Sequence, residues 1–249
     1  MTLWDGTFLT FLPVAVASTC SDTKIRLTYR AKGEHVDSSK LQGDTVPGTS
    51  ELGDDVIISS DTRRAERLPP NQVRTKKWPV LDSRGAPEIS ADTWTLTVTG
   101  LVETELSLDW HAFRELPRVK VFADMHCVTR WSRLANLWEG VSAETLLARA
   151  GVDSKARFVI AHGYDGDFTT NLPLGAFRSE DAVVADTHDR EPISLEHGGP
   201  VRLVVPKLYA WKSAKWLRAI ELVENDRAGY WEEGGYHMVG DPWEEERFR

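Results

Sequence analysis

The stretch Asp124–Val141 (DMHCVTRWSRLANLWEGV) decides the fold expected for this chain. The alternating apolar residues Val119, Val121 and Ala123 lead into it, which predicts a strand that breaks into a loop at Cys127. A cysteine thiolate suits soft or high-valent metal ions, but a lone cysteine cannot build a structural zinc site, which needs four protein ligands. A metal held here would therefore need a cofactor that brings most of its donor atoms.

Two further stretches carry long ordered motifs. One comprises His197–Pro206 (HGGPVRLVVP) and Tyr209–Trp216 (YAWKSAKW), and the other comprises Gly229–His237 (GYWEEGGYH) and Gly240–Trp243 (GDPW). With the cysteine stretch, they resemble sulfite-oxidase-type molybdopterin oxidoreductases of the short bacterial and archaeal branch. The resemblance covers Arg67–Arg249. It implies an α+β domain with a mixed β-sheet that holds the molybdenum cofactor, one molybdenum on a pterin dithiolene per chain, with the cysteine as an additional sulfur ligand.

Arg202 is the cofactor candidate that the sequence itself constrains most. It lies in the apolar run Val201–Val205, where a charge is costly unless it is paired, so the strand requires an anion nearby. The guanidinium could hold a pterin phosphate through two parallel hydrogen bonds, and a salt bridge to a carboxylate is the alternative. Gly198-Gly199 would let a ligand approach the backbone closely, and Lys212 would add positive charge. The resemblance implies that the other pterin contacts in this region are His197, Ser213, Ala214 and Lys215.

Two more assignments follow from the resemblance. The family has a further cofactor contact in a loop that matches residues 162–171, where the alternatives are His162, Thr169 and Thr170, and ordinary loop roles stay open for each. Tyr236 follows Trp231 at a W-x-x-x-x-Y spacing that resembles the position of the active-site tyrosine, and a phenol there can donate a proton during oxygen-atom transfer. Packing in a core or loop is the alternative for this tyrosine.

The segment Arg74–Pro79 (RTKKWP) resembles a region of pterin and active-site contacts. Lys77, or Lys76 beside it, stands where eukaryotic sulfite oxidases have an arginine. A lysine cannot reproduce the bidentate clamp that an arginine makes on an oxyanion. This difference weakens the case for sulfite as the substrate.

The reaction that the resemblance implies moves one oxygen atom between water and a small substrate, either a sulfite-like oxyanion or a sulfoxide. The two-electron chemistry belongs to the cofactor, and a haem motif C-x-x-C-H is absent, so a separate protein or carrier is expected to exchange the electrons. Two other hypotheses stay open. One is a cysteine hydrolase in which Cys127 works with His126, His162 or His197. The other is a degenerate, cofactor-free binding module.

Composition limits the remaining possibilities. Acidic residues (38) outnumber Lys and Arg (30), which argues against a nucleic-acid surface, and an apolar content of 41% supports a packed core. The apolar run Phe8–Ser18 has no Lys or Arg before it, so it does not fit a secretory signal, and no run is long enough for a membrane helix. We therefore expect a cytoplasmic protein without a membrane span.

Local patterns predict short elements within two regions of the chain. Residues 1–60 are expected to form a flexible or loosely packed extension, and residues 61–249 the molybdopterin-binding domain. Helices are predicted over Asp109–Leu116 and from a cap at Ser142 to Ala150, with Gly151 at the end. The predicted strands are Thr93–Thr99, Arg157–Ala161, Ala182–Ala185, Val201–Val205 and Leu217–Val223.

Overall fold

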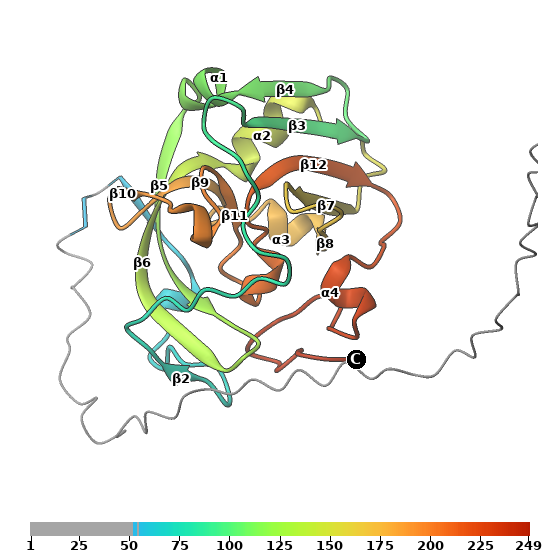
Figure 1. The fold of residues 1–249 in the computed structure, drawn as a ribbon. Coiled ribbons are helices and arrows are strands. Elements are labelled where there is room, and N and C mark those ends of the chain that lie inside the picture. The colour runs from blue at the N-terminus through green and yellow to red at the C-terminus, as the bar shows by residue number, and fades with distance from the viewer. Residues whose placement is uncertain (1–51, 54) are drawn as a thin grey trace, which may run out of the picture. The chain divides into compact units, whose positions relative to one another are not determined.

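The computed structural model describes residues 52–53 and 55–249 (Figure 1). The apolar run Phe8–Ser18, Cys20 and most of the expected N-terminal extension lie outside the described residues. Within the described part of the chain, no helix has the length and apolar character needed to cross a membrane.

A seven-stranded mixed sheet holds the cysteine stretch. Its strand order is β1–β5–β6–β9–β10, with β11 paired to β9 and β2 paired to β6. The β1–β5 and β2–β6 pairs are parallel, and the other pairs are antiparallel. The strands are β1 (Val56–Ile58), β2 (Val73–Arg74), β5 (Arg118–His126), β6 (Trp131–Ser142), β9 (Val183–His188), β10 (Glu191–Pro192) and β11 (Arg202–Val204).

A second, five-stranded sheet has the order β4–β3–β12–β7–β8. Only the β12–β3 pair in it is parallel. The strands are β3 (Thr95–Gly100), β4 (Leu106–Asp109), β7 (Phe158–Gly163), β8 (Thr169–Pro173) and β12 (Leu217–Val223). Two mixed sheets with few helices confirm the expected α+β class.

The helices are short, and their ends follow the sequence signals. The α2 helix begins after Ser142, whose hydroxyl accepts a hydrogen bond from the Thr145 backbone N–H, and it ends at Gly151, which has a φ of 68°. The α1 helix begins after Asp109, whose carboxylate accepts from the Ala112 N–H. The helices are α1 (Trp110–Arg114), α2 (Ala143–Ala150), α3 (Leu174–Phe177) and α4 (Tyr230–Glu233), with 3-10 turns η3 (Asp61–Arg63), η4 (Leu195–His197) and η5 (Ala210–Lys212).

Two hydrophobic cores lie against opposite faces of the seven-stranded sheet. Because side chains alternate along a strand, Val184 of β9 joins the main core, which also takes residues from α2 and the five-stranded sheet. Its neighbours Val183 and Ala185 join a second core around Trp138, against which Trp78 packs. This second core borders the candidate site.

The N-terminal boundary expected from the sequence is wrong by several residues. Residues Val56–Ile58 form β1, which pairs in parallel with β5, so they belong to the sheet. Immediately after them, the Ser59 hydroxyl donates a 2.6 Å hydrogen bond to Asp181, and both side chains are buried. The described part of the domain thus includes residues 56–60, which the sequence analysis assigned to a loose extension.

Candidate functional site

Cys127 follows directly after β5, where the strand turns toward β6, as predicted. Its N–H donates to the carbonyl of Trp131, its own carbonyl accepts from the Arg130 N–H, and the side chain of Gln72 donates to the same carbonyl. Thr129 donates a hydrogen bond of 3.1 Å to the Cys127 sulfur. The backbone therefore fixes the thiol at the end of a long strand, with 7% of the residue exposed.

Aromatic rings surround the thiol. We call this set the thiol cluster: Cys127, Val128, Tyr209 and Trp211, with Trp131, Ala210, Trp231 and Tyr236 packed against them. Tyr236 stacks on Trp231 with ring centroids 5.1 Å apart and meets the Trp211 ring edge-on at the same distance. The predicted pair of Cys127 and Tyr236 thus lies in one cluster.

Burial sets the charge state of both groups. It raises the pKa of the Cys127 thiol, and the hydrogen bond from Thr129 only partly opposes this effect. Burial, and secondarily the charge of Cys127, raises the pKa of Tyr236, so its phenol keeps its proton at neutral pH. A bound cation would instead favour the thiolate, which is the form that ligates metals.

His126 lies away from this cluster, although it precedes Cys127 in the chain. Its side chain is buried, and its Nδ1 atom is 2.8 Å from the hydroxyl of Ser132. Burial lowers the pKa of His126 to about 4. Among the described residues, no histidine forms a hydrogen bond with the Cys127 sulfur, so the nucleophile–base pair of a cysteine hydrolase is not present there.

Arg202 projects from β11 into the second core and is fully buried. Its guanidinium donates to the carbonyl oxygens of His197 (2.7 Å) and Ser213 (3.0 Å), and it lies within 6 Å of the rings of Trp78 and Trp138. Burial lowers the pKa of Arg202 to about 10. Within residues 55–249 no carboxylate pairs with it, so the alternative of a salt bridge is wrong for this part of the chain, and the charge lacks a counter-charge.

His197 and Lys215 gather beside Arg202, and we call these three residues the cation group. Burial and then the charge of Arg202 lower the pKa of His197, and the same two causes lower the pKa of Lys215 to about 8. Lys215 donates to the carbonyl of Glu196 and lies 3.6 Å from Asp82. A bound anion would favour the positively charged forms of all three side chains, so their electrostatics suit an anion.

Gly198 and Gly199 do not offer the open backbone that the sequence analysis expected a ligand to approach. A Cβ atom at Gly198 would meet the side chain of Lys215 at 2.7 Å, and one at Gly199 would meet the carbonyl of Ile193 at 2.0 Å. The close approach there is made by the protein's own chain. Ser213 and Ala214 are buried, and their carbonyls accept from Arg202 and from the Leu203 N–H, so these residues orient Arg202.

The remaining candidates lie elsewhere or play other roles. His162 on β7 forms a hydrogen bond of 2.9 Å with Glu221 of β12. Thr169 is paired with His162 on the neighbouring strand β8. No described contact joins either residue to Cys127 or to the cation group. Lys212 does not face the cation group, because its side chain is fully buried in an ion pair with Glu232.

Trp78 is a site residue that sequence reasoning missed. Its ring stacks on His197 at 3.8 Å with an interplanar angle of 4°, and it also contacts His188 at 4.3 Å. Its neighbour in the chain, Lys77, is the contact that the sequence analysis predicts in this segment, and the role of that lysine stays a prediction. A large aromatic beside two expected contacts was the available signal.

The residues present fit a molybdenum cofactor through the buried thiol and through buried N–H groups without a partner. The described residues contain no group of three or more His, Cys, Asp or Glu side chains that could hold a metal ion. The indole N–H groups of Trp131 and Trp138 are buried without a partner among described residues. Trp131 packs against both the thiol cluster and the second core, so this residue borders the surroundings of the thiol and those of Arg202.

Comparison with known proteins agrees with this chemistry. Residues 83–231 match the model of the oxidoreductase molybdopterin binding domain. An uncharacterized oxidoreductase of Bacillus subtilis, YuiH, is 46% identical over 183 residues, which cover 73% of this chain and 92% of that protein. The catalytic subunit MsrP of a protein-methionine-sulfoxide reductase from Campylobacter jejuni is 24% identical, over 76% of this chain and 66% of that protein.

A solved structure supports the fold. The sulfane dehydrogenase SoxCD of Paracoccus pantotrophus superposes with a TM-score of 0.53 at 21% identity, over 84% of this chain and 60% of that chain. With the buried thiol, the cation group and the matched residues, these comparisons confirm the resemblance to sulfite-oxidase-type enzymes. The chain belongs to the family of oxidoreductase molybdopterin-binding domains.

Proposed function

We propose that this enzyme transfers an oxygen atom with one molybdenum per chain and that Cys127 is the protein's ligand to the metal. The observation that carries the proposal is the position of Cys127: a buried thiol at the end of β5, fixed by its backbone and enclosed by the thiol cluster. A thiolate is a soft ligand, and burial excludes the water that would compete for the metal. The hydrogen bond from Thr129 orients the sulfur.

Arg202, His197 and Lys215 are proposed to bind the phosphate of the pterin. Carbonyl oxygens of Ser213 and His197 hold the guanidinium in place, so its charge is oriented before the anion arrives. Trp131 and Trp138 offer buried N–H groups without a partner among the described residues, and a bound cofactor could accept hydrogen bonds from them. When bound, the cofactor supplies the two-electron chemistry.

Tyr236 is proposed to donate one of the two protons that sulfoxide reduction consumes. Its phenol lies in the thiol cluster, and its raised pKa keeps the proton available at neutral pH. The rings of Trp211 and Trp231 pack against the Tyr236 ring and orient it. Tyr236 is thereby the chain's acid, and the other rings form the wall of the substrate site.

We propose a sulfoxide as the substrate in preference to sulfite. The wall is made of Tyr209, Trp211, Trp231 and Tyr236, and aromatic rings make favourable contacts with sulfur and its alkyl groups. Lys77 or Lys76 stands where an arginine would clamp an oxyanion bidentately. The similar MsrP protein is named for the reduction of methionine sulfoxide. In this reaction a sulfoxide, two electrons and two protons give a sulfide and water, and a separate electron carrier supplies the electrons.

Cys127→Ser tests the ligand assignment, with Cys20→Ser as the matched control. A serine hydroxyl is a harder and less polarisable ligand, so we expect Cys127→Ser to lose turnover while it keeps its fold. Elemental analysis of the control should give one molybdenum per chain, and the control should keep its turnover. Turnover near that of the control in a molybdenum-loaded Cys127→Ser protein would disprove the assignment.

The substrate is tested separately by assaying the same enzyme in both directions. Reduction of methionine sulfoxide and dimethyl sulfoxide is measured with a reduced dye as electron donor. Oxidation of sulfite is measured with an oxidised dye as acceptor. A value of kcat/KM for sulfite above those for both sulfoxides would overturn the preference and leave the metal assignment intact.

A further inference from the structure

A fully buried ion pair lies next to the thiol cluster. Lys212 of η5 and Glu232 of α4 have no exposed side-chain surface, and their charged atoms are 2.7 Å apart. Burying two charges is unfavourable unless every donor and acceptor is satisfied, and apolar residues of the same size often serve stability as well. Stability alone therefore does not account for this pair.

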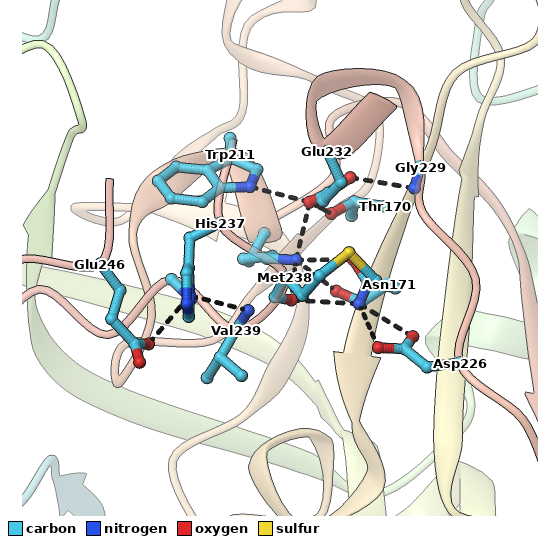
Figure 2. A network of polar contacts seen from close by, with 12 residues as sticks. Thr170, Asn171, Trp211, Asp226, Gly229, Glu232, His237, Met238, Val239 and Glu246 are labelled. Carbon is cyan, nitrogen blue, oxygen red and sulfur yellow. Dashed lines mark hydrogen bonds and ion pairs between the residues drawn. The ribbon is translucent and has the colours of Figure 1, made fainter. Parts of the chain in front are cut away.

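The carboxylate of Glu232 is saturated by hydrogen bonds from three different segments (Figure 2). Its Oε1 atom accepts from the indole N–H of Trp211 at 2.8 Å and from the hydroxyl of Thr170 at 3.0 Å. Its Oε2 atom accepts from the backbone N–H of Gly229 at 3.1 Å. The carboxylate thus ties η5 to β8 and to the start of α4.

The ammonium group of Lys212 completes the network. It donates to the backbone carbonyl of Asn171 (2.9 Å), to the side-chain oxygen of Asn171 (2.7 Å) and to the carbonyl of Met238 (2.6 Å). The amide of Asn171 in turn donates to both oxygens of Asp226 and to the carbonyl of Met238, as Figure 2 shows. The C-terminal segment around Met238 is therefore held to η5 and β8.

Trp211 connects this network to the thiol. Its N–H is held by Glu232, while its ring stacks on Tyr209 at 5.3 Å and meets Tyr236 edge-on at 5.1 Å. A Cβ atom at Gly240 would lie only 2.7 Å from the ring, so the backbone there packs closely against the indole. Trp211 belongs to the same cluster as Cys127. The orientation of this one ring is thus fixed at its nitrogen by a buried charge.

We propose that Glu232 is a positioning residue that acts through Trp211. By accepting from the indole N–H, it fixes the wall that holds Tyr236 against Cys127. The inference rests on the proposed function, in which Cys127 ligates molybdenum and Tyr236 donates the proton. The ion pair with Lys212 helps to orient the buried Glu232 carboxylate.

Two matched double variants separate the effect of the hydrogen-bond acceptor for Trp211 from the effect of the buried charge of Glu232. Lys212→Met/Glu232→Gln keeps an oxygen that can accept from Trp211, whereas Lys212→Met/Glu232→Met removes it. Both lose the ion pair and the acceptor for Gly229, so they differ in the acceptor that the Trp211 indole and the Thr170 hydroxyl share. Loss of a partner that orients an active-site group typically lowers activity by about 10- to 100-fold, so we expect kcat of the Met variant to be lower by about tenfold than that of the Gln variant. Molybdenum content and melting temperature should agree between the two.

The same pair in a Trp211→Phe background tests whether Glu232 acts through the indole. Without the indole N–H the two variants should have equal kcat, because the acceptor has no donor to fix. A difference in kcat that persists in the Trp211→Phe background would overturn the inference, and so would equal kcat in the Trp211 background. A general loss of stability would affect both backgrounds alike and cannot produce the expected pattern.

Single variants decide the question if the double variants do not fold. Trp211→Phe and Thr170→Val each remove one hydrogen bond to the same oxygen of Glu232, but only Trp211 touches the thiol cluster. We expect a larger fall in kcat for Trp211→Phe than for Thr170→Val, with KM changed similarly in both. Equal falls would contradict the positioning role.

A readout without the metal separates this inference from the proposed function. In Cys20→Ser protein made without the cofactor pathway, the rate of alkylation of Cys127 by iodoacetamide reports how well Trp211 covers the thiol. We expect faster alkylation in the Glu232→Met variant than in the Glu232→Gln variant. If the Glu232→Met variant is alkylated faster but the protein has no molybdenum-dependent activity, the proposed function alone is refuted. If the enzyme is active and the two variants have equal alkylation rates and equal kcat, the inference alone is refuted.

Discussion

At the scale of single residues, Arg202 is the side chain whose surroundings most restrict what it can bind. Its hydrogen bonds go to carbonyl oxygens, which orient the guanidinium, and no carboxylate of the described residues pairs with its charge. Burial and then the charge of Arg202 lower the pKa values of Lys215 and His197 beside it. Burying these basic side chains together lowers the stability of the folded protein unless an anion pairs with them.

Replacing Arg202 should separate cofactor binding from folding. Removing one partner of a buried charge pair typically costs about 3–5 kcal/mol, so Arg202→Met should lower cofactor retention by orders of magnitude. The cofactor-free protein should melt at nearly the same temperature as its parent, since it has no phosphate to leave unpaired. The molybdenum content of protein made with the cofactor pathway tests cofactor retention. The melting temperature of protein made without that pathway tests the effect on folding.

The matched control for this prediction is Arg218→Met. Arg218 also donates to a carbonyl oxygen, that of Gly163, but it lies on β12 outside the cation group. The Arg218→Met variant should retain its molybdenum. Full molybdenum occupancy in Arg202→Met would show that the pterin phosphate is held elsewhere.

Tyr236→Phe tests the proton donor by removing a single oxygen atom. General acid catalysis typically contributes 10²–10⁴-fold, so we expect kcat to fall by about that factor with molybdenum content unchanged. KM should change little, because the ring that forms the wall is kept. Tyr230→Phe is the control, because this neighbouring tyrosine of α4 also contacts Trp231, whose ring it meets edge-on at 5.1 Å. An equal fall in both variants would exclude a specific role for the Tyr236 phenol.

At the scale of elements, the strongest local patterns gave correct predictions. The strand Leu217–Val223 has the predicted bounds, and the helix from Ser142 to Gly151 has both predicted caps. In β3 and at Trp94 just before it, the alternation of Trp94, Leu96 and Val98 with threonines places the apolar side chains in the core. These segments carry their own signal, because periodicity and capping depend on neighbouring residues alone.

Features that depend on distant partners could not be predicted in this way. The short strand β1 has no pattern of its own and exists because β5 offers it an edge. Lys212 was expected near the cofactor because of its neighbours in the chain, but Glu232, from a different element, determines its position. The stacking of Trp78 on His197 likewise joins segments far apart in sequence. The motif residues Cys127 and Tyr236 lie in one cluster, and their roles stay predictions.

Truncations test the corrected N-terminal boundary. A chain that begins at Leu52 keeps β1 and the Ser59–Asp181 hydrogen bond, so we expect it to load molybdenum like the full chain. A chain that begins at Thr62 exposes the edge of β5 and leaves buried Asp181 without its Ser59 donor, which typically costs about 1–3 kcal/mol. Melting temperatures of both chains provide the measurement. Equal stability of the two would return the boundary to residue 60.

At the scale of the whole molecule, buried histidines make stability depend on pH. Burial is the main cause that lowers the pKa of His188 to about 4, from an ordinary value of 6.5, although Asp189 opposes it and Arg133, Arg202 and His197 add to it. Between these two values the unfolded chain binds a proton that the folded chain does not. Unfolding therefore takes up protons, and stability falls as the pH is lowered from about 6.5 toward 4.

The matching prediction concerns His188→Gln. The melting temperature of the cofactor-free parent should fall between pH 6.5 and pH 5, and the variant should show a shallower fall because it lacks this titrating group. His111→Gln is the control, since the His111 side chain is 84% exposed. A fall as steep in His188→Gln as in His111→Gln would show that other groups cause the acid sensitivity.

The interleaving of the two sheets has a consequence for synthesis on the ribosome. The hairpin of β3 and β4 is made before β5 and β6, and the hairpin of β7 and β8 is made after them. The strand that joins these hairpins is β12, which lies between β3 and β7 in the sheet and is made later than either. The nascent chain therefore carries two hairpins with open apolar edges until β12 emerges, and during that interval it should depend most on chaperones.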